Sequence, residues 1–240
     1  MEIKDIPAIV TGIAALIGAI AALIKAIKLQ KCRVIIRDTL FWIATVLAVL
    51  FAGSTLWLLM RPCVDPSKYG FEEGPMGWVP QTYETDQGIT AVAQSADQAK
   101  FCKNSLMLTA DLEGGHANRS KGEAYVEIPI QNLEGKPITV WVYVPQEALG
   151  DPQKPNGIQV FVKDRNFKGE YGTWWNITPA KVDAWFQVTL VPSTTAPPDG
   201  YMAPGFDPTL IGAVGVKVAI GEGSTAEYRG PIYVDGVDWP

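Results

Sequence analysis

Two long apolar runs stand near the start of the chain, at Ile6–Ile27 and Leu40–Met60. Each has roughly the 20 residues that a helix needs to cross a hydrocarbon core of about 30 Å at about 1.5 Å per residue. The short connection between them carries a cluster of basic residues: Lys28, Lys31, Arg33 and Arg37. Cytoplasmic loops of membrane proteins are enriched in such residues. The pattern therefore predicts a cytoplasmic connection, with both chain ends on the other side of the membrane.

This interpretation predicts three parts: residues 1–61 as two transmembrane helices, about 6–27 and 40–60, residues 62–70 as a linker, and residues 71–240 as an extracytoplasmic domain. The chain is then an integral membrane protein, with the lipid bilayer as a partner. A cleaved signal peptide is the alternative for the first run. It fits less well, because signal peptides carry positive charge before their apolar core, whereas this chain opens with the acidic segment Met1-Glu-Ile-Lys-Asp5.

Charge and cysteine placement differ between the two halves. Residues 71–240 contain 12 Lys and Arg against 21 Asp and Glu, an acidic balance that disfavours non-specific binding to nucleic acid phosphates.

The three cysteines are divided by the predicted membrane. Cys32 falls in the predicted cytoplasmic connection, whereas Cys63 and Cys102 fall on the outer side, where a disulfide can form. We expect a Cys63–Cys102 disulfide if the fold brings their Cα atoms within reach.

The region after residue 71 has the pattern of an antiparallel β-sandwich. Apolar and polar residues alternate in several segments, for example Thr139–Val144 and Gly157–Lys163, and turn-forming residues such as Leu133-Glu-Gly-Lys-Pro137 bound them. Strands are predicted at Ile89–Ala93, Ser105–Ala110, Ala124–Ile130, Ile138–Val144, Ile158–Lys163, Trp185–Leu190, Ala213–Ile220 and Ile232–Val237. Short strands in this number with long loops favour a jelly roll or a related sandwich.

A series of short motifs then carries a family resemblance. The segments run in the order Phe71–Trp78, Ser105–Leu108, Leu133–Pro145, Gln159–Asp164, Trp174–Pro179, Trp185–Leu190 and Gly230–Trp239. Together they resemble the jelly-roll carbohydrate-binding modules appended to bacterial polysaccharide hydrolases, over essentially all of 71–240. The resemblance implies an all-β, galactose-binding-like sandwich in a bacterial protein, and it leaves the two apolar runs outside. Together with those runs, it predicts a sandwich fused to an N-terminal two-helix membrane hairpin in a bacterial plasma membrane.

An aromatic and polar segment, residues 164–176, is the candidate sugar site. Pyranose rings stack on aromatic side chains, and their hydroxyls need convergent polar groups. In modules of this kind the matching stretch contributes to the binding face, so the expected sugar platform is Phe167, Tyr171 and Trp174, with Arg165 and Asp164 as polar partners. The alternative is that part of this cluster is core, because in an alternating strand one of Trp174 and Trp175 must point inward.

The resemblance also implies a structural Ca²⁺. In related modules an acid of the first motif and an acid of the closing motif bind calcium, and here these correspond to Glu72 and Asp235. Carboxylate oxygens suit this cation.

The sequence contains none of the common catalytic motifs. It has no Gly-x-Ser-x-Gly elbow, phosphate loop, zinc spacing or Cys-x-x-Cys. We therefore expect no enzyme activity.

Two functions remain open at this point. The first is a non-catalytic, membrane-anchored module that binds polysaccharide or cell-wall glycan. The second is an accessory or structural subunit of a larger membrane complex, whose hairpin packs on integral membrane partners and whose sandwich covers the outer face. A stripe of small residues along the first apolar run favours the second, because close helix packing in lipid uses such residues.

Overall fold

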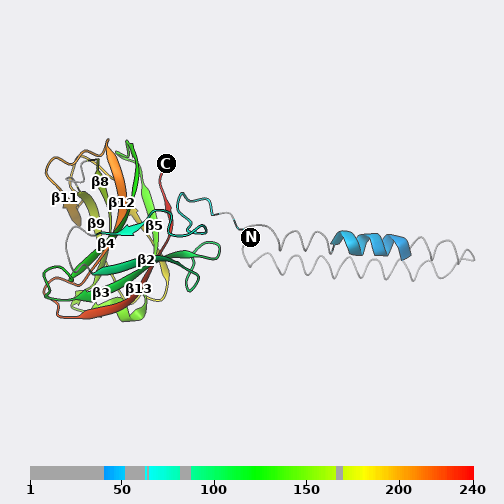
Figure 1. The fold of residues 1–240 in the computed structure, drawn as a ribbon, viewed down its shortest axis with the longest axis horizontal. Coiled ribbons are helices and arrows are strands. Elements are labelled where there is room, and N and C mark those ends of the chain that lie inside the picture. Colours follow the sequence, from blue (N-terminus) through cyan, green and yellow to red (C-terminus); the bar gives the residue numbers. More distant parts are fainter. Residues whose placement is uncertain (1–40, 52–62, 64, 82–87, 166–169) are drawn as a thin grey trace, which may run out of the picture. The chain divides into compact units, whose positions relative to one another are not determined.

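The computed structural model describes residues 41–51, 63, 65–81, 88–165 and 170–240 of the chain. Contacts separate the chain into two units, Met1–Pro62 and Cys63–Pro240. In the second unit the described strands form two layers (Figure 1). The loops at the strand ends complete this unit, and they include one 3₁₀ turn, Gln146–Leu149.

The first layer is a six-stranded antiparallel sheet in the order β1-β4-β12-β8-β9-β11. Its strands are β1 (Val79–Pro80), β4 (Lys121–Gln131), β12 (Ile211–Ala219), β8 (Gly157–Asp164), β9 (Glu170–Asn176) and β11 (Gly200–Met202). Strand β12 pairs with β4 on one side and β8 on the other, so three long strands form the middle of the sheet.

The second layer is a five-stranded sheet in the order β10-β5-β13-β3-β2. Its strands are β10 (Trp185–Leu190), β5 (Ile138–Tyr143), β13 (Glu227–Asp238), β3 (Ser105–Glu113) and β2 (Ile89–Ser95). A short hairpin of β6 (Gly150–Asp151) and β7 (Lys154–Pro155) projects beside the sandwich. Each of the eight predicted strands overlaps an observed one, and the predicted antiparallel β-sandwich is confirmed.

Alternating side chains explain why these segments form a sandwich. In β8 the side chains of Ile158, Val160 and Val162 enter the core between the sheets, while those of the intervening residues face away from it. The strands β5, β12 and β13 contribute valines and isoleucines to the same core at period two. Branched side chains at alternate positions pack well on a pleated surface, which favours strand over helix.

The predicted membrane hairpin is corrected by the structure. The first apolar run, 6–27, lies outside the described residues, and the second is described only as a helix over 41–51. Within the described part of the chain, no helix is both long and apolar enough to cross a membrane. The prediction of an integral membrane protein fused to a transmembrane hairpin is contradicted on this ground.

Candidate functional site

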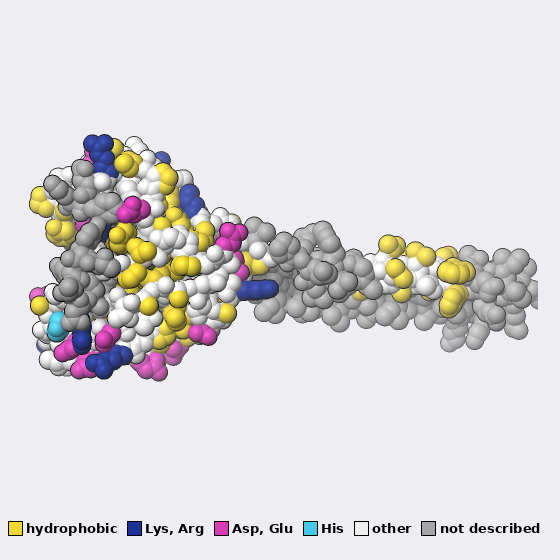
Figure 2. Space-filling view, in the orientation of Figure 1, with side chains coloured by type: hydrophobic (Ala, Val, Ile, Leu, Met, Phe, Trp, Pro, Cys, Tyr) yellow, Lys and Arg dark blue, Asp and Glu magenta, His cyan; other side chains and the backbone are white. Residues whose placement is uncertain are grey.

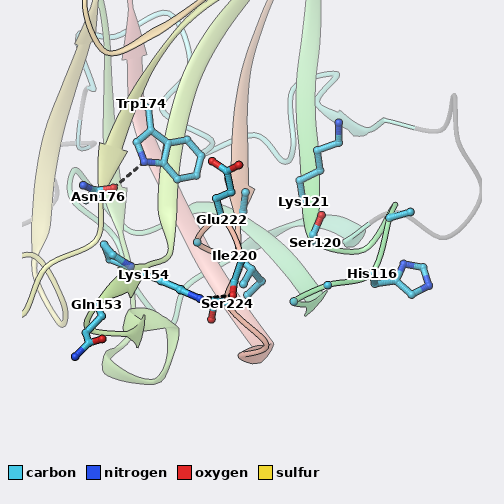
Figure 3. Close-up of a pocket in the computed structure, with 17 residues that line it drawn as sticks. His116, Ser120, Lys121, Gln153, Lys154, Trp174, Asn176, Ile220, Glu222 and Ser224 are labelled. Atoms are coloured by element: carbon cyan, nitrogen blue, oxygen red, sulfur yellow. Dashed lines mark hydrogen bonds between the residues drawn. The ribbon is translucent and has the colours of Figure 1, made fainter.

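A pocket of about 800 Å³ opens at one end of the six-stranded sheet. Its walls come from the loop that joins β3 to β4, from the β6–β7 hairpin, from the loop after β12, and from the last residues of β9. Figure 3 shows Trp174, Asn176, Gln153 and Lys154 along one side, with Lys121 and His116 along the other. The volume lies within the roughly 300–1,000 Å³ typical of small-ligand sites.

Trp174 lies flat against the neighbouring strand. A Cβ atom built on Gly157 of β8 would come within 1.9 Å of the indole, so the ring occupies the space that a side chain at residue 157 would need. The indole Nε1 donates a hydrogen bond to Asn176 Oδ1 at 2.7 Å. Glycine on one strand and this hydrogen bond on the other thus fix the ring against the sheet, at the pocket wall.

Polar residues line the same pocket from different loops. Its described lining includes these polar residues: His116, Ser120, Lys121, Gln153, Lys154, Asn176, Glu222 and Ser224. The Nζ atom of Lys154 donates to the carbonyl of Gly223 at 2.6 Å. His116 Nδ1 accepts from the backbone N–H of Arg119 at 3.0 Å, so a neutral His116 ring carries its proton on Nε2.

A group of four charged residues fills the middle of the outer face of this sheet, beyond Trp174. Glu123 Oε1 lies 2.9 Å from Lys217 Nζ, and its Oε2 lies 3.2 Å from Lys163 Nζ. Lys217 Nζ also lies 3.1 Å from Glu170 Oε1. We call Glu123, Lys163, Lys217 and Glu170 the ion quartet.

The ion quartet is withdrawn from solvent. Glu123 and Lys163 are each 5% exposed, although their side chains leave the sheet on the side opposite the core. Burial alone raises the pKa of Glu123, but Lys217 and Lys163 outweigh it and hold that pKa below its usual value. Burial alone lowers the pKa of Lys217, and Glu123 and Glu170 reverse this, so the net shift is upward. Both groups are therefore held in their charged forms.

Phe161 forms the floor beneath the ion quartet. Its ring centre lies 5.0 Å from Lys163 Nζ and 5.8 Å from Lys217 Nζ, and the side chain is fully buried. A Cβ atom on Gly215 would lie 2.3 Å from the Phe161 ring, so this ring also lies flat on the next strand. Ammonium groups above an aromatic face gain a cation–π attraction, which adds to the ion pairs.

The structure separates the residues of the predicted sugar platform. Trp174 lines the pocket. Tyr171 lies in the core, 4% exposed, with its ring stacked on that of Phe206 at 5.3 Å, so this ring does not face a ligand. Asp164 is buried at the end of β8, and Arg165 is exposed just after it. Phe167 lies outside the described residues.

Strand register explains this separation. Trp174 pairs with Gln159, whereas Asp164 is five residues further along β8, which is about 17 Å at the usual rise of a strand. Asp164 and Arg165 therefore lie toward the opposite end of the sheet from the pocket. Of the predicted sugar residues that the structure describes, only Trp174 lines the pocket.

The predicted calcium ligands hold a loop. Glu72 Oε1 accepts the backbone N–H groups of Lys103 and Asn104, each at 2.8 Å. Asp235 Oδ2 accepts those of Lys100 and Phe101, at 2.8 and 2.9 Å. One oxygen of each predicted calcium ligand therefore accepts two backbone N–H donors of the same loop.

One further carboxylate bears on the calcium prediction. Asp65 Oδ2 is buried without a hydrogen-bond donor. Burial raises the pKa of Asp235 to about 6, with a smaller contribution from the Asp65 charge, even though three backbone amides donate to Asp235. Among the described residues, no group of three or more His, Cys, Asp or Glu is arranged to hold a metal. Calcium binding stays a prediction.

A disulfide ties the same loop to the start of the domain. Cys63 and Cys102 are bonded, with their Cα atoms 5.4 Å apart. Tyr69 then pairs with Val237 of β13 through two backbone hydrogen bonds. The residues after Cys63 thus join the sandwich before its first strand, and the loop over 98–104 is held by the disulfide and by two carboxylates.

Comparisons with known proteins find solved structures that are similar to this chain. No family model matches the sequence, and no curated protein matches it. A structure from the carbohydrate-binding modules of the β-sandwich superfamily aligns with 74% of this chain and 63% of its own, at 22% identity and a TM-score of 0.49. The chain thus spans less than two thirds of that protein.

Two further solved structures are similar to this chain, with TM-scores in the same range. A family 11 carbohydrate-binding module of a Clostridium thermocellum cellulosomal cellulase aligns over 73% of this chain and 93% of its own, at 14% identity and a TM-score of 0.44. A xylan-binding module, CBM15, aligns over 67% and 88%, at 17% identity and a TM-score of 0.42.

Most of the pocket was not foreseen from the sequence. Lys121, Gln153 and Glu222 belong to separate segments with no motif in common. Their only shared signal is that each lies beside a glycine-rich or turn-forming stretch at the end of a strand. Such a signal predicts loops, and loops carry many binding residues, but it does not say which loops meet.

Proposed function

We propose that the unit Cys63–Pro240 is a non-catalytic carbohydrate-binding module, and that its ligand site is the pocket beside Trp174. The single observation that carries this proposal is the indole held flat by Gly157 and Asn176 at the wall of a polar pocket. The order of short motifs that resembles jelly-roll carbohydrate-binding modules gives independent support.

The chemistry of the pocket suits a sugar. The C–H face of a pyranose packs on an aromatic ring, and an immobilised ring needs no ordering when the sugar arrives. Sugar hydroxyls both donate and accept hydrogen bonds. Lys121 supplies donors, Glu222 supplies acceptors, and Gln153 supplies both. In the described part of the chain, Lys121 and Glu222 form no ion pair with each other or with another residue, so both can bind a ligand.

The same pocket argues against hydrolysis. A glycosidase uses two carboxyl groups on either side of the scissile bond, about 5–10 Å apart. Glu222 is the one carboxylate among the described residues that line the pocket. A binding role needs no second carboxylate.

Basic side chains do not gather in the middle of the face of the domain seen in Figure 2. Acidic and basic side chains stand mainly at its margins, with hydrophobic side chains nearer the middle. Together with the acid excess of residues 71–240, this supports a neutral polymer such as a polysaccharide over nucleic acid as the ligand.

Retention on polysaccharides tests the proposal. The full chain is incubated with cellulose, xylan, mixed-linkage β-glucan, chitin and peptidoglycan, and bound protein is measured together with hydrolysis products. We expect retention on at least one polymer without product release, and loss of retention in Trp174→Ala. Tyr201→Ala is the matched control, because Tyr201 is an aromatic residue of the same sheet that is 52% exposed and does not line the pocket. Absence of retention on every polymer would refute the proposal.

A further inference from the structure

The outer face of the six-stranded sheet is organised in rows of side chains that run across the strands. Register places Lys121, Ala219, Gly157 and Asn176 in the row that borders the pocket. The next row toward the middle of the sheet contains Glu123, Lys217, Gln159 and Trp174. Trp174 therefore stands in the same row as two members of the ion quartet.

The ion quartet continues from that row across the face. Lys163 and Glu170 lie directly opposite each other. Lys163 follows Gln159 by four residues on β8, and Glu170 precedes Trp174 by four residues on the antiparallel strand β9, a separation of about 13 Å at the rise of a strand. The contacts Lys163–Glu123 and Lys217–Glu170 cross this interval diagonally, above Phe161. Ion pairs thus occupy the outer face immediately beyond the Trp174 row.

Gln159 stands between Trp174 and Lys217 in the same row of side chains. Its side chain lies over Gly172 of β9, where an added Cβ atom would come within 2.6 Å of the amide nitrogen, and Gln159 is 6% exposed. Gly172 under Gln159 and Gly215 under Phe161 leave room for these side chains against the sheet, and Lys163 and Lys217 extend over Phe161. The ion quartet residues and Gln159 are not among the residues that line the pocket.

We infer that the pocket binds the end of a glycan chain, a stretch of about one to three sugar units, and that the ion quartet is the element that excludes internal segments of a long polymer. The inference rests on the proposed function. A sugar stacked on Trp174 has open pocket on one side and paired, desolvated charges on the other. A chain that continued across the sheet would have to displace those pairs, and burial makes each of them costly to separate.

Pocket size agrees with this ligand class. About 800 Å³ is in the range that encloses a drug-sized molecule, the size of a di- or trisaccharide. Loops bound the pocket on the side away from the sheet, at 114–120 and at 220–224. The ion quartet therefore acts as a specificity element without being part of the stacking platform.

Counting binding sites before and after partial cleavage of the polymer tests the inference. The polysaccharide that retains the full chain in the panel above is cut by an endo-acting hydrolase to a tenth of its mean length, and binding capacity is measured at constant polymer mass. We expect the capacity to rise about tenfold, in step with the new chain ends. A constant or reduced capacity overturns the inference and leaves the proposed function standing, whereas no retention on any polymer overturns both.

Oligosaccharides of one to six units from the same polymer give a second measurement on the wild-type chain. The dissociation constant should fall up to two or three units and then stay within twofold. A steady fall of tenfold or more from three to six units contradicts the inference.

The variant Glu123→Ala with Lys217→Ala removes one positive and one negative charge and leaves Lys163 opposite Glu170. If it folds, hexasaccharide should gain at least fivefold in affinity over trisaccharide, while Glu127→Ala, on the same face of β4, should not change this ratio.

Discussion

The indole of Trp174 rests on Gly157, in the space that a Cβ atom would fill at 1.9 Å from the ring. This contact joins β9 to β8 on the outer face of the sheet and presents the indole to the pocket. An aromatic ring is useful for stacking only when its orientation is fixed, and here a glycine on the neighbouring strand fixes it. A substitution at Gly157 therefore tests the role of the ring position while Trp174 itself is unchanged.

Gly157→Ala should weaken glycan binding about tenfold, or about 1.4 kcal/mol, because the added methyl group pushes the indole away from the strand. The domain should stay folded, since the atoms displaced belong to the far end of the Trp174 side chain. Binding is measured by titration calorimetry and folding by thermal melting. Gly212→Ala on β12 is the control: its Cβ atom would lie 3.3 Å from Arg165 Cα, and binding should not change. Equal affinity of Gly157→Ala and wild type would show that the ring position is immaterial.

Glu123→Gln should lower the free energy of unfolding by about 2–3 kcal/mol. Removing one partner of a buried ion pair costs about 3–5 kcal/mol when the other is left alone, but here Lys217 keeps Glu170 and Lys163 keeps Gln81. Glu127→Gln is the matched control, because Glu127 is an exposed residue on the same face of β4 and should cost less than about 0.5 kcal/mol. Urea denaturation of the three chains measures the difference, and equal losses in the two variants would contradict the structural role of the ion quartet.

The same substitution should change how stability depends on pH. The folded pKa of Glu123 lies below the ordinary value of 4.5 because of Lys217 and Lys163, so its contribution is present above pH 4.5 and is lost as the pH falls through the lowered pKa. The folded pKa of Lys217 lies above 10.5, so its contribution is full below that pH and is lost as the pH rises through the raised pKa. The difference in free energy of unfolding between wild type and Glu123→Gln should therefore become smaller at strongly acid pH. A gap that stays constant from pH 7 to pH 2 would exclude this linkage.

Reduction of the Cys63–Cys102 disulfide should lower the free energy of unfolding by about 4 kcal/mol, the chain-entropy value for a closed loop of this size. The bonded residues are 39 apart in the sequence. Cys63→Ser should reproduce the effect, and adding reductant to this variant should then cause no further change. Cys32→Ser serves as the control for cysteine substitution. Melting curves with and without reductant measure all of these, and an unshifted curve for reduced wild type would contradict the stabilising role.

The calcium prediction is decided by chelation. If a structural calcium is bound, EDTA lowers the melting temperature of the metal-loaded chain and added Ca²⁺ restores it. Asp65→Asn should abolish that response if the buried oxygen without a donor takes part. An identical melting temperature with EDTA and with Ca²⁺ would reject the site and leave Glu72 and Asp235 as acceptors for the backbone of the loop over 98–104.

The membrane prediction shows where sequence reasoning failed. Apolar composition over about 20 residues is the usual criterion for a membrane-spanning helix, and the run Leu40–Met60 meets it. The structure describes residues 41–51 of that run, and among the described residues no helix is long and apolar enough to cross a membrane. Hydropathy measures the preference of side chains for lipid, and it does not by itself establish a membrane-spanning helix.

The amino-acid sequence by itself determined the strands and the class of fold, because period-two alternation fixes which side chains of a strand can share a core. It also singled out Trp174 as an aromatic candidate. Only the tertiary structure decided that Tyr171 is core and Trp174 lines the pocket, that Gly157 lies beneath the indole, and that Glu222 and Lys121 share one pocket. Those facts depend on the register between β8 and β9 and on which loops meet at the end of the sheet. Register and loop contacts join residues far apart in the chain, so no local pattern encodes them.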